Sequence, residues 1–136
     1  MKSRTTTPLI LSALFVYATF FGFISLVRQA GGADLIENFA AGDFPVGLAF
    51  DGTDLWVANF STNGTATKLR ASDGLILDTV TLGNYPLWAT YDGENVWVTI
   101  RGDDVVAKVR ASDDTVLGTF PVGHSPQHVL FDGTNI

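Results

Sequence analysis

The pattern of apolar and polar residues changes near residue 33. Upstream, residues 5–27 carry no charge, and residues 8–27 form a predominantly apolar run. This run has no polar face and no amphipathic period, which argues against a core helix of a globular domain. Downstream, short apolar runs alternate with clusters of Gly, Asp, Ser and Asn, as is typical of antiparallel strands joined by turns. The pattern therefore predicts a leader followed by an all-β region.

Eight strands are predicted in two successive groups of four. The first group is residues 46–50, 54–59, 66–71 and 75–82; the second is residues 87–91, 95–100, 105–111 and 115–122. Asp-Gly pairs separate the first two strands of each group, because Gly accepts a positive φ and Asp caps the turn. Asp114 stands where the first group has Gly74, so we expect Asp114 to take the left-handed conformation, which Asp tolerates.

The two groups are copies of one repeat. Asp51, Asp92 and Asp132 are each followed by Gly, and the spacing between successive Asp-Gly pairs is nearly constant. A period of about 40 residues with four short strands is typical of a β-propeller blade. We therefore predict an all-β fold: a partial β-propeller of four-stranded antiparallel blades, about two and a third repeats, preceded by an N-terminal hydrophobic helix.

The predicted organisation is a leader over residues 1–33 and an incomplete repeat domain over residues 34–136. The repeat units are about residues 44–84, 85–124 and 125–136. Residues 36–42 resemble the end of a unit and are predicted to be the lone fourth strand of a preceding blade. Ile136 aligns with Leu55 and Val96, each of which is followed by Trp-Val. We therefore expect a truncated gene product or a fragment of a larger propeller, whose open blade edges invite self-association.

The leader has the layout of a secretory signal. Lys2 and Arg4 precede the apolar run, and small residues follow it up to Ala33, after which cleavage is expected. The alternative is an uncleaved anchor, because a helix of about 20 residues spans about 30 Å, the thickness of a hydrocarbon core. Both alternatives place the repeat domain outside the cytoplasm, periplasmic or secreted, with membrane contact only through residues 8–27 if they are retained.

Residues that recur at the same place in each unit are interpreted as structural. Trp56 and Trp97 share one position, and large residues repeating once per blade are packing features of propellers. Residues 68–70 and 108–110 alternate charged and apolar side chains. They are interpreted as the solvated face of a third strand.

The repeats contain the patterns DG-x-x-[LVI]-W-V and K-x-R-A-S-D. In these patterns the chain resembles the YncE-like and virginiamycin-B-lyase-like propeller repeats of exported bacterial proteins. The resemblance covers residues 36–136 and implies a ring of about seven blades. It implies little about activity, because such propellers carry unrelated functions.

Positions at which the copies differ are the candidates for ligand binding. They lie in or beside the connection from the outer strand of one unit to the inner strand of the next, which in propellers lines one face of the ring near the channel. An aromatic side chain beside polar, variable neighbours suits recognition of a small molecule, a peptide or a protein. The candidate residues are Asp43, Asn84, Tyr85, Trp88, His124 and His128.

His124 and His128 are also the candidates for acid–base chemistry. Pro126 lies between them, so they are not a metal-ligand pair on a helix. The resemblance implies a catalytic His in the lyases, but the acidic metal ligands of that site have no match here. A surface or packing role is therefore favoured, and no metal or cofactor is predicted. Arg101-Gly102-Asp103 spells an integrin-binding tripeptide, but Gly-Asp is ordinary turn chemistry.

Charge argues against nucleic acid as a partner. Downstream of residue 33 there are five basic and fourteen acidic side chains, a formal charge of −9. A field of this sign repels phosphate backbones. The leading prediction is a non-enzymatic, exported binding or interaction module of unknown ligand. The alternative is a fragment of a virginiamycin-B-lyase-like, metal-dependent lyase.

Overall fold

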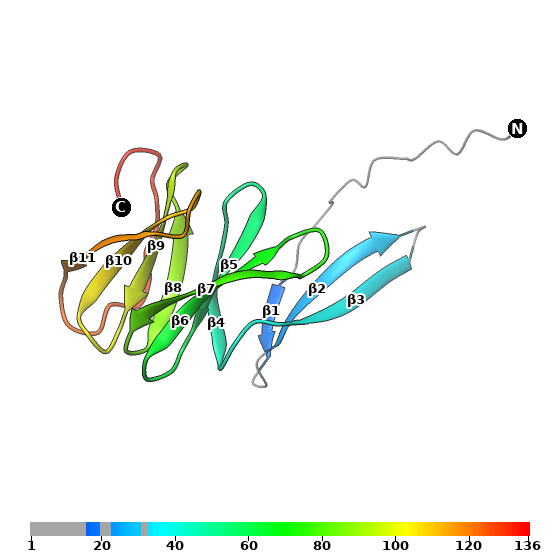
Figure 1. Cartoon of the computed structure of the whole chain (residues 1–136), viewed down its shortest axis with the longest axis horizontal. Coiled ribbons are helices and arrows are strands. Elements are labelled where there is room, and N and C mark those ends of the chain that lie inside the picture. The colour runs from blue at the N-terminus through cyan, green and yellow to red at the C-terminus, as the bar shows by residue number, and fades with distance from the viewer. Residues whose placement is uncertain (1–15, 20–22, 31–32) are drawn as a thin grey trace, which may run out of the picture.

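A computed structural model describes residues 16–19, 23–30 and 33–136. All regular elements in these ranges are β-strands (Figure 1). Their bounds are β1 Val16–Thr19, β2 Phe23–Ala30, β3 Ala33–Ala40, β4 Pro45–Phe50, β5 Asp54–Asn59, β6 Gly64–Arg70, β7 Ile76–Gly83, β8 Pro86–Tyr91, β9 Asn95–Ile100, β10 Val105–Arg110 and β11 Val116–Pro121.

The strands form two four-stranded antiparallel meanders. Blade 1 has the order β4-β5-β6-β7, and blade 2 has the order β8-β9-β10-β11. The eight predicted strands are confirmed, with every bound within two residues of the observed one. Along the molecule, a three-stranded N-terminal sheet, blade 1 and blade 2 follow one another (Figure 1). The arrangement is that of consecutive propeller blades.

The N-terminal sheet, β1-β2-β3, repeats the strand register of a blade. Its strands correspond to the second, third and fourth strands of blades 1 and 2. The matching series of Cα partners are Val16, Leu26 and Glu37 in the N-terminal sheet, Trp56, Lys68 and Asp78 in blade 1, and Trp97, Lys108 and Gly118 in blade 2. The segment predicted to be a lone fourth strand is therefore paired, because β2 supplies its neighbour.

The leader is extended where the structure describes it. Of the predicted helix over residues 8–27, residues 8–15 and 20–22 lie outside the described residues. Residues 16–19 and 23–27 lie in β1 and β2. A uniformly apolar run has no period that distinguishes helix from strand, and for residues 23–27 the pairing of β2 with β3 decides. In the ranges that the structure describes, no helix is long and apolar enough to cross a membrane. The signal or anchor role stays a prediction.

The main hydrophobic core lies between blades 1 and 2. Trp56 is fully buried there, which confirms its predicted packing role. The other buried members are Ala49, Ala58, Ala66, Ala89, Val96, Val98, Ile100, Ala107, Val109 and Ala111. A second core lies between the N-terminal sheet and blade 1 and contains Ile24, Ala41, Leu55, Val57 and Leu69. Each side of blade 1 is thus covered by a neighbouring sheet.

The recurrent Asp-Gly turn holds the recurrent Trp. Asp51 accepts hydrogen bonds from the Thr53 and Asp54 amides (2.9 and 2.8 Å) and from Trp56 Nε1 (2.9 Å). Asp92 makes the equivalent bond to Trp97 Nε1 at 2.6 Å. Burial disfavours the ionised carboxylate of Asp51, but these hydrogen bonds outweigh it and hold its pKa below the ordinary value. The DG-x-x-[LVI]-W motif is therefore a structural unit.

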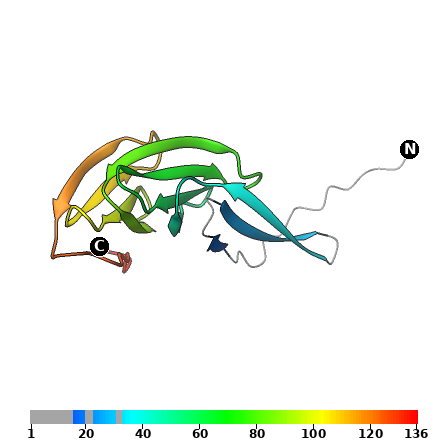
Figure 2. The same cartoon turned by 90° about the horizontal axis from the view of Figure 1, so that it is seen from below.

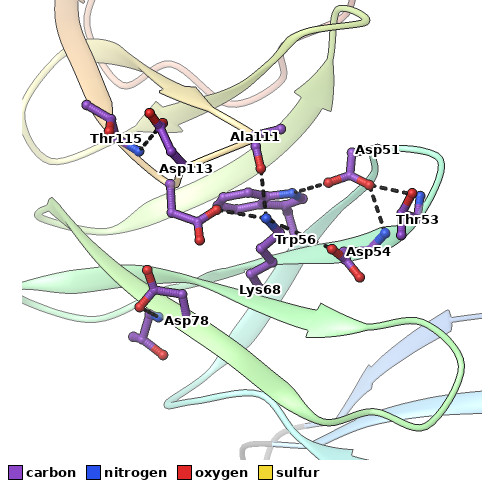
Figure 3. A network of polar contacts seen from close by, with 11 residues as sticks. Asp51, Thr53, Asp54, Trp56, Lys68, Asp78, Ala111, Asp113 and Thr115 are labelled. Atoms are coloured by element: carbon purple, nitrogen blue, oxygen red, sulfur yellow. Dashed lines mark hydrogen bonds and ion pairs between the residues drawn. The ribbon is translucent and has the colours of Figure 1, made fainter.

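Lys68 corrects the prediction of a solvated third strand. Its side chain is buried between the blades, where Nζ donates to the carbonyl oxygen of Ala111 (2.7 Å; Figure 3) and to Asp114 Oδ1 (2.9 Å). The same Nζ lies 3.9 Å from Asp54 Oδ2 and 5.1 Å from the centre of the Trp56 ring. Asp114 has the expected left-handed conformation, with φ 61°. Strand alternation could not reveal this burial because blade 2 covers that face.

Candidate ligand-binding face

Three connections follow an outer strand, at residues 42–45, 83–86 and 123–126, and the first two lead into the inner strands β4 and β8. In each, the residue before Pro has a positive φ: 52° at Phe44, 60° at Tyr85 and 53° at Ser125. Such a conformation is uncommon for residues other than Gly and persists only where the surrounding structure imposes it. We call these connections, together with the turns at residues 60–63 and 101–104, the connector face.

Tyr85 joins the turns of two adjacent blades. Its amide donates to the carbonyl oxygen of Ser61 in blade 1 (2.9 Å), and its carbonyl oxygen accepts from the Arg101 amide in blade 2 (3.0 Å). Its ring packs on Phe60, with the ring centres 5.0 Å apart. The backbone is thus fixed on both sides while the Tyr85 side chain stays exposed. This leaves an aromatic surface on a rigid support.

Asn84 is held by the turn that contains the Arg-Gly-Asp tripeptide. Its amide donates to Asp103 Oδ2 and its Nδ2 to Asp103 Oδ1, both at 2.8 Å. These two bonds lower the pKa of Asp103. A side chain at Gly102 would collide with Tyr85 and Asn84. The tripeptide is therefore a turn, as predicted, and its carboxylate is engaged within the fold.

His124 is paired with a carboxylate at the equivalent place in the next connection. His124 Nδ1 lies 2.7 Å from Asp104 Oδ2, and Asp104 Oδ1 accepts from the Ser125 amide at 2.8 Å. The Ser125 bond, with the His124 contact, lowers the pKa of Asp104. The His124 side chain is 97% exposed. Asp103 and Asp104 thus each fix one connection, a role that the sequence analysis missed.

Trp88 and His128 form a second aromatic pair. Their ring centres are 4.8 Å apart, and the rings are inclined at 58°. The Trp88 amide donates to Thr99 Oγ1 (3.0 Å), and Thr99 Oγ1 lies 3.2 Å from the carbonyl oxygen of Gln127. The segment that carries His128 is therefore seated beside the inner strand β8. Trp88 is 38% exposed, so an accessible aromatic surface remains.

Gly47, the counterpart of Trp88 in blade 1, has a packing role. A Cβ at this position would collide with the carbonyl oxygen of Leu87 and with the Cα of Trp88. Only Gly lets the inner strands β4 and β8 approach this closely. The lack of a side chain at residue 47 therefore follows from blade packing.

The six predicted residues do not converge on one point. Asn84 and Tyr85 lie together with Phe60, Trp88 pairs with His128, and His124 pairs with Asp104. The remaining candidate, Asp43, is exposed in the first connection. The two histidines have different partners. Among the residues that the structure describes, no group of three or more His, Cys, Asp or Glu could hold a metal ion.

Among the described residues, cavities of about 450 and 410 Å³ lie away from the connector face. One, of about 450 Å³, is lined by Asp51, Asp54, Lys68 and Glu94 at the opposite turns of the blades. Its Asp carboxylates are engaged with Trp56 and Lys68, so it is a structural network. The other, of about 410 Å³, is lined largely by aromatic and aliphatic side chains of blade 2 and unit three. Neither was predicted from the sequence.

Comparison with solved structures shows the fold. Hydrazine synthase of Kuenenia stuttgartiensis matches with a TM-score of 0.69 and 14% identity, over 79% of this chain and 32% of its own. A nidogen/laminin complex matches with a TM-score of 0.60 and 20% identity, over 78% of this chain and 42% of its own. Glutaminyl cyclase of Myxococcus xanthus matches with a TM-score of 0.57 and 17% identity, over 81% of this chain and 47% of its own. All three are propeller-like folds. This chain has a β-propeller-like fold.

The chain spans less than half the length of each of these structures. Structural similarity at identities this low shows the fold alone and leaves activity open. No family model matches the sequence, and no curated protein matches it.

Proposed function

We propose that the connector face is a binding site for a peptide or small molecule that presents a cationic or aromatic group. The observation that carries the proposal is the pair of exposed aromatic surfaces at Tyr85 and Trp88, each supported by a neighbouring ring and a fixed backbone. Aromatic side chains on a rigid support bind with little loss of conformational freedom.

The charge of the surroundings favours a cationic ligand. Asp43, Asp103 and Asp104 lie on the connector face, and the domain is acidic overall. A cation above an aromatic ring is attracted by the ring quadrupole, and a negative field raises its local concentration. An anionic ligand would meet repulsion from the same carboxylates.

Short Gly/Ser peptides with one central Arg, Trp or Asp test this proposal. In NMR titrations of the full chain, the Arg and Trp peptides are expected to shift the resonances of the connector face, and the Asp peptide is expected to bind least. Trp88→Ala is expected to weaken binding of the Arg peptide by about tenfold, the size of one cation–π contact in a partly desolvated site.

Phe50→Ala is the matched control for this experiment. Phe50 is an exposed aromatic residue at the far end of an inner strand, next to the Asp51 turn. Its loss should leave peptide binding unchanged. Equal binding of the Arg and Asp peptides, or full binding by Trp88→Ala, would contradict the proposal.

The second candidate is a lyase of the virginiamycin B type. The observation in its favour is the His124–Asp104 pair, because a carboxylate at Nδ1 orients an imidazole for proton transfer. The same samples decide between the two functions. Metal-dependent elimination of a virginiamycin-B-type substrate that is lost in His124→Ala favours the lyase, whereas binding without turnover favours the module.

We also propose that the protein is a YncE-like propeller that works outside the cytoplasm, supported by the basic start and apolar run of the leader. Ile24 is buried against blade 1, so removal of the leader would uncover this core. We therefore favour export with the leader retained. The mass of the chain isolated from the extracytoplasmic fraction tests this, since cleavage after Ala33 would remove the whole leader from that mass.

A further inference from the structure

The part of the connector face that belongs to blade 1 has a described sheet on each side. Blade 1 lies between the N-terminal sheet and blade 2 in both views of the molecule (Figure 1, Figure 2). The connections at residues 42–45 and 83–86 are both hydrogen-bonded to the turn at residues 60–63. These three segments contribute one aromatic residue each, and we call the set the aromatic strip: Phe44, Phe60 and Tyr85.

The aromatic strip is held together by one ring contact and one backbone hydrogen bond. The Tyr85 ring packs on Phe60, with the ring centres 5.0 Å apart and the rings inclined at 38°. The Phe60 amide donates to the carbonyl oxygen of Phe44 at 2.8 Å, so Phe44 lies next to the same turn. Phe44 is 53% exposed and Tyr85 is 38% exposed. The strip therefore presents apolar ring surface to solvent.

The backbone groups of the aromatic strip are paired within the fold. The Tyr85 amide donates to the carbonyl oxygen of Ser61, and the Tyr85 carbonyl oxygen accepts from the Arg101 amide. The Phe60 amide is used in its bond to Phe44. A peptide that binds by adding a strand needs a row of free main-chain groups, which these bonds remove. Recognition on the strip must therefore come from its side chains.

The two ends of the aromatic strip carry opposite charges. Asp43 lies at the Phe44 end and is exposed, whereas the exposed Arg101 lies at the Tyr85 end. The carboxylates in the turn that contains Arg101 accept hydrogen bonds from neighbouring connections, so they are already engaged within the fold. A cationic group of a ligand would meet repulsion from Arg101 at one end and attraction to Asp43 at the other. Charge therefore favours a ligand whose basic residue lies at the Asp43 end.

We propose that the aromatic strip binds a proline-rich segment of a protein partner in the polyproline II conformation, with a basic residue of that segment at Asp43. The inference rests on the proposed function of the connector face and narrows its ligand to one class. Proline has no amide N–H, so a proline seated on the rings leaves no main-chain donor unpaired. A polyproline II helix is rigid before it binds, and such segments dock on surfaces lined by aromatic side chains.

The ring pair of the strip matches this ligand in size. A polyproline II helix has three residues per turn and rises about 3.1 Å per residue, so two successive residues cover about 6 Å. The ring centres of Phe60 and Tyr85 are 5.0 Å apart. Two adjacent prolines can thus lie over this pair while the segment continues past Phe44 to Asp43. Because both partners are rigid, little conformational freedom is lost on binding.

Two acetylated peptides of equal length and charge test the class of ligand. Each begins with Arg, followed in one by a run of Pro and in the other by a run of Gly and Ser. In NMR titrations of the full chain, the Pro peptide is expected to bind about tenfold more tightly, because its conformation is fixed beforehand, and to shift the resonances of the aromatic strip. Equal affinities would overturn this inference and leave the proposed function standing. No shift on the connector face with either peptide would overturn both.

Tyr85→Asn tests the ring surface without disturbing the backbone. The φ of Tyr85 is 60°, a left-handed conformation that Asn tolerates better than Ala, so the connection should keep its shape. Loss of the ring is expected to weaken binding of the Pro peptide by about tenfold, the size of one aromatic contact. Phe50→Ala again removes an exposed aromatic ring far from the connector face and should leave the affinity unchanged.

Asp43→Lys tests the charged end of the strip. The parent chain is expected to prefer the Arg-led Pro peptide over one led by Glu, and Asp43→Lys is expected to reverse that preference, with the Arg-led peptide losing about fivefold in affinity, the size of an exposed ion pair. Glu94→Lys changes the net charge equally but lies in the turn at the opposite end of the strands, so it should keep the parent's preference.

Three further results would overturn the inference. They are a Tyr85→Asn chain that binds the Pro peptide as the parent does, an Asp43→Lys chain that still prefers Arg over Glu, and a Glu94→Lys chain that reverses its preference as Asp43→Lys does. A neutral oligosaccharide that shifts the resonances of the strip while the Pro peptide does not would assign the strip to carbohydrate instead.

Discussion

Trp56→Ala is expected to lower the free energy of unfolding by about 4 kcal/mol, the usual cost of truncating a buried Trp. The side chain is fully buried between the blades, and its Nε1 also holds Asp51. Truncation leaves a cavity between the two sheets and removes a donor from a partly buried carboxylate. Because small domains are stable by only about 5–15 kcal/mol, the variant should be close to unfolding. Urea denaturation followed by circular dichroism measures the loss.

Trp97→Ala is the matched control for Trp56→Ala. It removes the same residue type from the same repeat position, where the ring is only partly buried. The expected cost is about 2 kcal/mol or less, because less surface returns to water. Equal losses for the two variants would show that burial between the blades is not the cause.

Lys68→Met is expected to cost about 3 kcal/mol of stability, as do other breaks in buried ion pairs. Met keeps the apolar stem over Trp56 but removes the ammonium that lies between Asp114 and Asp54. Burial and the nearby charge of Asp51 already raise the pKa of Asp54, whereas Lys68 lowers it. Without Lys68, the ionised Asp54 carboxylate would therefore destabilise the folded state. The carbonyl of Ala111 would also lose its donor. The same urea titration measures this loss.

Two further variants separate the ion pair from general packing. Lys108→Met changes the equivalent Lys of blade 2, which is partly exposed and lies over Trp97, and should cost less than about 1 kcal/mol. Asp114→Asn combined with Lys68→Met removes one orphaned charge and should recover part of the stability. A double variant no more stable than Lys68→Met would contradict the role assigned to Asp114.

The positions of the aromatic side chains on the connector face are set by residues from other strands and turns. Tyr85 and Trp88 belong to one short connection and the start of one strand, yet their positions are fixed by Ser61, Arg101 and Thr99 from other strands and turns. The contacts of Phe60, Asp103 and Asp104 with the connections escaped the sequence analysis, because these residues lie in hairpin turns whose nearness to the connections depends on how the blades stack. Their residue types, ordinary in turns, gave no separate indication.

The sequence by itself determined the strands, the turns and the repeat. Alternating apolar residues, Asp-Gly turns and a regular repeat period are local properties of the chain. Asp51 and Asp92 hold their turns through neighbours close in sequence, the farthest being Trp56 and Trp97. The packing role of Trp56 followed from its recurrence. The same local rules could not assign the apolar leader to a helix or to strands. A run of β-branched and aromatic residues is compatible with a membrane helix and with a buried strand.

Only the tertiary structure decided which repeated positions are buried. Lys68 and Lys108, or Trp56 and Trp97, are equivalent in the repeat, but blade 2 covers the first of each pair and no described blade covers the second. The pairing of β2 with β3 and the closeness of β4 and β8 at Gly47 are likewise decided by contacts between separate segments. A repeat specifies the shape of one blade, whereas burial, charge pairing and strained connections arise only where two blades meet.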